Sequence, residues 1–583
     1  MPTLEWIGKS KVINHHQDVP FRVLERKYSF DENGQHDEDN GSENMIIRGD
    51  NLEALKALLP RYEGRVKCIY IDPPYNTGNE GWVYNDNVND PKIKKWLGEV
   101  VGKEGEDLTR HDKWLCMMYP RLKLLQKLLA DDGVIFISID DTEYANLKLI
   151  CDEIFGSNCF VSNISWQRTY STRNDSKGIV NEVEHLVVYS KLPDWNPNKL
   201  PRTAEMDAKY KNPDNDRTLW RTDNAFAPGA ATHQGMVYAI QHPFTGKMLY
   251  PANGRCWTFG QDQMLEIMRG WCGYELRDLN DAHERAVVCG VPESDVRQGV
   301  QAIVLSESLE ISAQKAQAVY DRGQWPRFFF TKGGKGGIAR KIYLENVGGK
   351  LPTNFWAFTE TGHTDEAKKE MLAIFDGKAT FDTPKPHRLI EFVLKVAGNE
   401  SALVLDSFAG SGTTAHAVLN MNKADGGHRK FILVEMMDYA DSITAERVKR
   451  VIRGYGEGKN AVEGTGGNFS FYDLGEPLLH GDVLNENVGV EKIREYVYFT
   501  DTKASLPESH PDEPYFMGVH IGSAYYFYYE KQAVTTLNRE FLHTVKTKAD
   551  SYVICADLCT LSEAELEKYH ITFKKIPRDI TKL

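Results

Sequence analysis

The chain has 583 residues, enough for about three or four domains, and its apolar and charged fractions are those of an ordinary soluble protein. Its net charge of −13 argues against a generally sticky nucleic-acid binder but is compatible with a local basic cleft. We expect no membrane span, no signal peptide, and neither structural zinc nor disulfides from nine scattered cysteines. These features favour the reducing cytoplasm.

The first part of the chain predicts a short arm followed by alternating strands and helices. Residues 1–43 are interpreted as an N-terminal arm and linker, because 30–44 are acidic and rich in Gly and Asn. Strands are predicted at 45–48, 66–71 and 134–139, and helices at 51–59, 112–130 and 142–155. This alternation predicts βαβ units and a mostly parallel sheet within a first half-domain at 44–190.

The pattern then weakens and later resumes. Residues 191–350 are rich in Pro, Gly, Asn and aromatic residues, which predicts an inserted domain. Helices at 386–397, 412–421 and 440–453 and strands at 402–406 and 430–435 predict a second α/β half-domain at 351–475. The last residues, 476–583, are interpreted as a separate C-terminal domain.

A rigid tetrapeptide, Asp72-Pro73-Pro74-Tyr75, follows the strand at 66–71. The two prolines cannot continue the strand, so it must end there. A carboxylate, a stiff backbone and an aromatic ring therefore lie at the carboxyl end of a strand, where open α/β sheets bind ligands. The alternative interpretation is a Pro-rich turn with no further role.

A glycine-rich turn follows the strand at 402–406. Gly410 and Gly412 permit a tight turn and close approach of a ligand to the backbone. Glu435 ends the next strand, at a spacing suited to ribose hydroxyls. The spacing Gly410-x-Gly412-x-x-Ala415 also satisfies the dinucleotide fingerprint, so a nicotinamide-dependent oxidoreductase and a purely structural turn remain alternatives.

The two motifs together favour methylation of an exocyclic amino group of adenine or cytosine. Such an amine is a poor nucleophile because its lone pair is delocalised into the ring. The Asp72 carboxylate and the Pro73 carbonyl would each accept one N–H, localising the lone pair and aligning the nitrogen with a sulfonium methyl group. Pro74 would stiffen the loop and Tyr75 would stack on an extruded base. This chemistry requires no metal.

These residues resemble the amino-group DNA methyltransferases. Asp72–Tyr75 is similar to their catalytic motif, and Phe408–Gly412 is similar to their S-adenosylmethionine loop. The order of the two motifs resembles the β class, in which a target-recognition domain is inserted between the halves of the catalytic fold. The resemblance implies a Rossmann-like α/β methyltransferase fold with a permuted motif order, recognition at 191–350 and a small C-terminal α+β domain.

The finer resemblance is to the Mod subunits of type III restriction–modification systems. It is carried by residues 72–78, 362–370, 383–386, 408–416 and 426–435. It implies double-stranded DNA as substrate, a homodimer and an ATP-dependent restriction subunit, and Asp72 favours N6-adenine over N4-cytosine. A stand-alone methyltransferase, a catalytically silent DNA-binding subunit and RNA methylation remain alternatives.

The resemblance also implies which residues contact the cofactor. Lys385 either reaches the cofactor carboxylate or is a solvated residue, whereas Asp112 and Asp140 are expected to cap helices. The expected cofactor contacts are Asp50, Asp72, Lys385, Asp406, Phe408, Ala409, Gly410, Ser411, Gly412, Thr413 and Glu435.

A basic segment, residues 322–341, is the best candidate for DNA contact because it has no acidic residue and contains interleaved aromatics. Its cations would neutralise phosphates. Alternatively, its aromatics are local core and its lysines a solvated loop. A second candidate is 166–177, which could line a pocket for the flipped base. The candidate contacts are Arg168, Arg173, Arg322, Arg327, Lys332, Lys335, Arg340 and Lys341.

Overall fold

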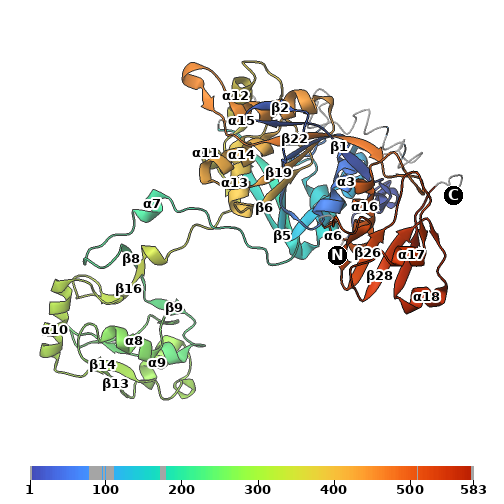
Figure 1. Cartoon of the computed structure of the whole chain (residues 1–583). Coiled ribbons are helices and arrows are strands. Elements are labelled where there is room, and N and C mark those ends of the chain that lie inside the picture. Colours follow the sequence, from blue (N-terminus) through green and yellow to red (C-terminus); the bar gives the residue numbers. More distant parts are fainter. Residues whose placement is uncertain are drawn as a thin grey trace. The chain divides into compact units, whose positions relative to one another are not determined.

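A computed structural model describes residues 3–77, 95, 99, 110–170, 179–507 and 510–578. The chain divides into two compact units (Figure 1). Unit 1 is Met1–Asn198 with Pro352–Leu583, and unit 2 is Lys199–Leu351. Unit 2 therefore interrupts unit 1 in the sequence, close to the expected insert at 191–350. Residues 476–583 are grouped with unit 1. Among the described residues, no helix is long and apolar enough to cross a membrane.

Unit 1 is built on one large mixed sheet. Strands β5, β4, β18, β19, β3 and β22 run parallel, and antiparallel strands extend the sheet on both sides. The predicted mostly parallel α/β sheet is thereby confirmed. The full order is β17 (Phe355–Trp356), β6 (Phe160–Gln167), β7 (Val183–Ser190), β5 (Leu129–Ile139), β4 (Val66–Ile71), β18 (Leu403–Asp406), β19 (Lys430–Glu435), β3 (Met45–Arg48), β22 (Phe469–Pro477), β1 (Arg22–Asp31) and β2 (Gly34–His36).

Helices cover both faces of this sheet (Figure 1). Helices α3 (Asn51–Tyr62), α5 (Arg110–Leu128) and α6 (Tyr144–Phe155) share a core with Ile69 and Ile71. Helices α13 (His387–Ala397) and α14 (Thr413–Asp425) contact β4, β5 and β19 from the other face, and α15 (Glu446–Arg453) packs on α14. Both faces of β4 are covered, which explains why its sequence is a continuous apolar run.

The N-terminal segment differs from the prediction. Strand β1 pairs with β22 and forms a hairpin with β2, so the acidic, Asn-rich stretch makes a turn at the sheet edge. Ser42 donates a hydrogen bond to Asn468 at 2.7 Å, which fixes the chain beyond the hairpin. The expectation of a flexible linker is therefore wrong. The pairing partner lies more than 400 residues away, and no local pattern signals it.

Outside the large sheet, three smaller sheets have three or four strands each. In unit 1, β25 (Phe516–His520), β26 (Ser523–Phe527), β28 (Ser551–Ala556) and β30 (Ile571–Lys575) form a four-stranded sheet beside α16 (Val490–Thr502). In unit 2, β11 (Met248–Leu249), β10 (Ile240–Gln241), β14 (Ala302–Leu305) and β13 (Tyr274–Arg277) form another, while β15 (Phe328–Phe330), β16 (Ile338–Tyr343) and β8 (Trp220–Asn224) form a third. Unit 2 also contains helices α7 (Ala204–Asp207), α8 (Gln261–Met268), α9 (Ala282–Cys289) and α10 (Leu309–Arg322).

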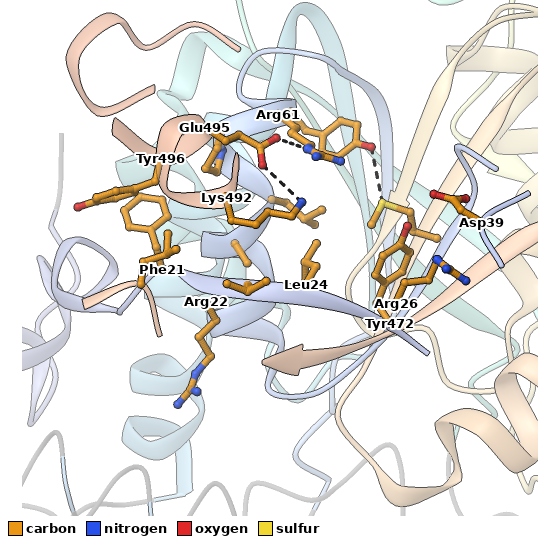
Figure 2. A pocket seen from close by; sticks show the side chains of 17 residues that line it. Phe21, Arg22, Leu24, Arg26, Asp39, Arg61, Tyr472, Lys492, Glu495 and Tyr496 are labelled. Carbon is orange, nitrogen blue, oxygen red and sulfur yellow. Dashed lines mark hydrogen bonds and ion pairs between the residues drawn. The ribbon is translucent and has the colours of Figure 1, made fainter. Parts of the chain in front are cut away.

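Helix α16 packs on α3 and leaves a cavity of about 260 Å³ beside β1. Figure 2 shows that Arg61 and Lys492 both pair with Glu495 on one side of this cavity. None of the predicted catalytic or cofactor residues lines it. The cavity thus lies where α16 meets α3 and strand β1 of the large sheet.

Candidate active site

The two predicted motifs lie next to each other in space. Strands β4 and β18 are parallel neighbours, with Cys68 opposite Val404 and Ile69 opposite Leu405. The chain continues from β4 to β5 on one side and from β18 to β19 on the other, so the strand order reverses between them. In open α/β sheets ligands bind at such a switch point. The tetrapeptide and the glycine turn therefore flank the position where the topology predicts a ligand.

A buried lysine is paired with the carboxylate of the tetrapeptide. The ammonium of Lys385 lies 2.7 Å from Oδ2 of Asp72 and 2.9 Å from Oη of Tyr75, which in turn donates to Oδ1 of Asp72 at 2.8 Å. The three residues are only 6%, 4% and 7% exposed for Asp72, Tyr75 and Lys385. The interpretation of Lys385 as a solvated residue is therefore wrong. Its ammonium also lies 5.1 Å from the centre of the Tyr75 ring.

Burial and charge act against each other in this pair. Burial raises the pKa of the Asp72 carboxyl above its usual range, and the nearby Lys385 charge opposes that rise. Burial alone would lower the pKa of Lys385, but Asp72 and Glu184 raise it. The lysine therefore stays charged, and the aspartate has an unusually high proton affinity for a group with a cationic partner.

Glu184 and Arg168 complete the cluster. Oε2 of Glu184, on β7, lies 3.3 Å from the Tyr75 hydroxyl and 3.7 Å from the Lys385 ammonium. Arg168 donates to Oε1 of the same carboxylate at 2.9 Å. Two carboxylates and two cations thus balance one another. Sequence analysis missed Glu184 as a site residue, because only the register of β7 on β5 and β6 brings it here.

The backbone of the tetrapeptide is held from the helices behind it. The indole N–H of Trp114, on α5, donates to the carbonyl of Pro74 at 2.7 Å. Asn76 adopts a left-handed conformation, with φ of 60°, and its amide donates to Glu143 at 2.5 Å. These contacts fix the direction in which the chain leaves β4. The two prolines therefore act with a buried indole to make this strand end rigid.

Asp406 anchors the glycine turn at the end of β18. Its Oδ1 accepts from the backbone N–H of Phe408 at 3.0 Å, and its Oδ2 accepts from the hydroxyl of Thr414 at 2.6 Å. Burial raises the pKa of Asp406 to about 7. The side chain thus connects the strand, the turn and the start of α14.

Glu435 holds the same turn from the end of β19. Its two oxygens accept from the backbone N–H groups of Gly410 at 2.8 Å and Met437 at 2.9 Å, and burial raises its pKa to about 8. Gly412 has a φ of +80°, and a Cβ there would lie 3.0 Å from the carbonyl oxygen of Thr444. A side chain at this position would therefore be strained and crowded.

One pocket joins the two motifs. Its volume of about 20 Å³ leaves room for about one water. Of the predicted cofactor residues, Asp50, Gly412 and Glu435 are not among those that line it. The lining residues are Tyr70, Asp72, Phe381, Thr383, Pro384, Lys385, Asp406, Phe408, Ala409, Gly410, Ser411, Thr413 and Thr414.

Three further carboxylates lie at or near the starts of helices. Asp50 caps α3, accepting from the backbone N–H of Leu52 at 2.8 Å. Asp140 accepts from the backbone N–H of Thr142 at 2.8 Å in the turn before α6, but the N-cap position of that helix is Glu143, so the predicted capping role of Asp140 is wrong. Asp112 lies inside α5, so its predicted place as the cap before that helix is wrong.

The basic segment of unit 2 is only partly available for DNA. Lys341 is fully buried and bonds to Asp214 and, at 2.6 Å, to Asp216, so its predicted phosphate contact is wrong. The acidic partners come from about 125 residues earlier, which the local sequence could not show. Phe328–Phe330 form the buried strand β15, as the alternative interpretation expected.

The other candidate cations differ in their surroundings. Arg340 is paired with Asp223 at 2.7 Å, and Arg168 with Glu184 as described. Arg173 lies outside the described residues. The exposed candidates are Arg322, Arg327, Lys332 and Lys335.

Comparison with known proteins identifies the family. The Mod subunit of the type III restriction-modification enzyme StyLTI from Salmonella typhimurium is 33% identical over 71% of this chain and 58% of its own length. The EcoPI Mod subunit of Escherichia phage P1 is 28% identical over 74% and 63%. The type II methyltransferase M.KpnI of Klebsiella pneumoniae is 29% identical over 68% and 81%. The chain thus spans less than two thirds of the length of either Mod subunit. A family model described as a DNA methylase matches residues 66–446, and the chain belongs to this N6/N4 DNA methylase family.

Proposed function

We propose that the chain transfers a methyl group from S-adenosylmethionine to the N6 amino group of adenine in double-stranded DNA by base flipping. The observation that carries this proposal is the pocket shared by Asp72 and the turn Gly410–Thr413, at the switch point of the sheet. A buried carboxylate beside a glycine turn can hold an amine next to a nucleoside cofactor. Membership of the DNA methylase family supports this chemistry.

The residues of the turn fit the cofactor. The tight Gly412 turn brings backbone close to a ligand, and Glu435 lies at the end of the neighbouring strand. When bound, S-adenosylmethionine supplies an electrophilic methyl group. Residues of the turn, including Phe408 and Gly410, would hold it, while Lys385 lies between this turn and Asp72 in the same pocket.

Asp72 would orient the amine and stabilise the charge that develops on it. Its two oxygens each accept one hydrogen bond in this structure, from Lys385 and Tyr75, and each oxygen has a second lone pair that could accept from an incoming amine. The amine nitrogen becomes positive as its new bond to carbon forms, and a buried carboxylate stabilises that charge. The raised pKa of Asp72 also suits it to accept the proton that the nitrogen releases. Stacking of the base on Tyr75 would require its buried ring to become accessible.

A transfer assay tests this proposal. The chain is incubated with double-stranded DNA and S-adenosylmethionine carrying a labelled methyl group, and the methylated base is mapped by sequencing. We expect label in N6-methyladenine. Asp72→Asn should reduce transfer by at least about a hundredfold while binding of S-adenosylhomocysteine is kept.

Asp140→Asn is the matched control, because Asp140 directly follows the neighbouring strand β5 and its described hydrogen bonds are local ones to Thr142. It should retain wild-type transfer. Unchanged transfer by Asp72→Asn would refute the mechanism, and label in N4-methylcytosine would refute the choice of adenine.

We further propose that unit 2 recognises the DNA sequence and that the chain acts as a homodimer with an ATP-dependent restriction subunit. The names of the Mod relatives and the exposed cations of unit 2 support this. A stand-alone methyltransferase is the second candidate, favoured by the 81% of M.KpnI that the chain covers. Affinity purification of the tagged chain from its native cells tests the choice. Recovery of a co-purifying ATPase supports the first candidate, and recovery of the chain alone supports the second.

A further inference from the structure

A buried arginine contacts the glycine turn Gly410–Thr413 on the side away from the pocket. Arg447, on α15, has a fully buried side chain. One guanidinium nitrogen, Nη1, donates to the hydroxyls of Ser411 at 2.9 Å and Thr413 at 2.7 Å. The other, Nη2, lies 3.3 Å from Oε2 of Glu370 and 3.1 Å from Nδ1 of His416. This side chain therefore connects the turn to α12 (Thr364–Ile374) and α14.

Two of the residues around Arg447, Glu370 and His416, form with His387 a cluster that resembles a metal site. Their hydrogen bonds indicate instead that they bind the guanidinium of Arg447. Glu370, His387 and His416 place ligand atoms within 4.8 Å of one another. The carboxylate of Glu370 is already bonded to Nδ1 of His387 at 2.7 Å, and His416 accepts from Arg447. A guanidinium, which stays charged at any physiological pH, thus supplies the cation to this cluster.

The protonation of the cluster agrees with this arrangement. Burial alone would raise the pKa of Glu370, but the hydrogen bond from His387 and the charges of its cationic neighbours bring it to about 2. Burial lowers the pKa of His416 well below its usual value, so its Nδ1 is a neutral acceptor. Glu370 is therefore a fixed anion that holds the guanidinium of Arg447 in place.

The segment before Arg447 holds the turn at a second point. Thr444, in the π-helical turn Asp441–Ala445, donates to the carbonyl of Gly410 at 2.5 Å. Its own carbonyl oxygen leaves little room for a Cβ at Gly412, as described above. Together with Glu435, which accepts from the N–H of Gly410, these contacts fix the amide, the carbonyl and two hydroxyls of a four-residue turn. Single π-turns inside helices are frequent at functional sites.

We propose that Arg447 is a positioning residue for cofactor binding, which sets the conformation of the turn Gly410–Thr413 through the hydroxyls of Ser411 and Thr413. This inference rests on the proposed function. Arg447 itself lies behind the turn and is not among the residues that line the pocket. It acts by holding the loop in its binding geometry before the cofactor arrives, which reduces the ordering cost of binding.

Conservative substitution of this arginine separates positioning from folding. Arg447→Lys keeps a positive charge beside Glu370 but lacks the planar fork needed to reach both sides of the cluster. Hydrogen bonds to charged groups are strong enough that their loss should weaken binding of S-adenosylhomocysteine by about tenfold or more in calorimetry. The KM for S-adenosylmethionine should rise in parallel, while kcat stays within about threefold.

Arg450→Lys provides the matched control on the same helix. Arg450 pairs with Glu446 and with Asp376 at the surface, away from the turn, so its variant should bind S-adenosylhomocysteine as the wild type does. Ser411→Ala, alone and combined with Arg447→Lys, completes a double-mutant cycle. If the arginine acts through this hydroxyl, the combined loss should be smaller than the product of the two separate fold-losses.

Amide hydrogen exchange at residues 410–413 gives a readout without cofactor. Exchange in the ligand-free protein should be faster in Arg447→Lys than in Arg450→Lys. Wild-type affinity of Arg447→Lys with unchanged exchange would overturn the inference, and so would strictly multiplicative losses in the cycle. If the wild type binds no S-adenosylhomocysteine, the proposed function fails. Faster exchange in Arg447→Lys would then still show that Arg447 positions the turn Gly410–Thr413.

Discussion

The buried pair of Asp72 and Lys385 makes a quantitative prediction. Their side chains are each 8% exposed and their charged atoms lie 2.7 Å apart. Removing one partner of a buried ion pair leaves an uncompensated charge and costs about 3–5 kcal/mol, whereas replacing both costs far less. We therefore expect Asp72→Asn and Lys385→Met each to be strongly destabilising, and the double variant to be more stable than the sum of the two losses implies.

The surrounding charges predict which single variant is worse. After Asp72→Asn, the Lys385 ammonium still has Glu184 at 3.7 Å and the Tyr75 hydroxyl at 2.9 Å. After Lys385→Met, two buried carboxylates remain with Arg168 as their described cation. The cost of Lys385→Met should therefore lie at the upper end of the range, about 5 kcal/mol, and that of Asp72→Asn at the lower end, about 3 kcal/mol.

Equilibrium urea unfolding of the full chain, followed by circular dichroism at pH 7, measures the four free energies. The Lys385→Met deficit should also shrink as the pH falls toward 5. Without the lysine, the folded-state pKa of Asp72 rises further above its unfolded-state value. The penalty is therefore complete above the folded-state pKa, shrinks as the pH falls between the two values, and is absent below the unfolded-state pKa. Additive losses in the double variant, or single losses below about 1 kcal/mol, would refute the buried ion pair.

Three further predictions follow from other contacts. Burial raises the pKa of Glu435 to about 8, so its contribution to the free energy of unfolding should fall as the pH rises from about 4 to 8. Urea unfolding of Glu435→Gln should show less of this fall, by on the order of a few kcal/mol. Parallel pH curves for the variant and the wild type would contradict this prediction. Lys341→Met should destabilise unit 2 by about 3–5 kcal/mol, since it leaves Asp214 buried without its cation; a thermal melt of the full chain that matches wild type would count against this. Lys332→Gln with Lys335→Gln should reduce the slope of log affinity for DNA against log salt by about two, if both contact phosphates; an unchanged slope would place DNA elsewhere.

The alternation of strands and helices could be predicted from the sequence because each of these elements has a local cause. Strand β4 was predicted at its observed bounds, since a strand covered on both faces needs a continuous apolar run that two prolines then end. The same holds for β19 and, within a few residues, for α13 and α14. The order of the two motifs along the chain was enough to indicate the class of fold that the sheet now shows.

The contacts between distant segments were decided by tertiary structure alone. Strand β1 looked like part of an arm because its partner, β22, lies at the other end of the chain. Lys341 looked like a DNA contact because its acidic partners are about 125 residues away. Such errors share one cause, which is that charge pairing and strand pairing depend on spatial neighbours that local composition does not contain.

The sequence by itself located the two groups to which the proposed chemistry is assigned: a carboxylate on a rigid strand end, and a glycine turn after a second strand. Only the tertiary structure decided their partners. Parallel pairing of β4 and β18 brings the two groups together, and β7 and α15 place Glu184 and Arg447 beside them. Burial then sets the proton affinities of Asp72 and Glu435, since a charge loses its hydration only where other segments cover it.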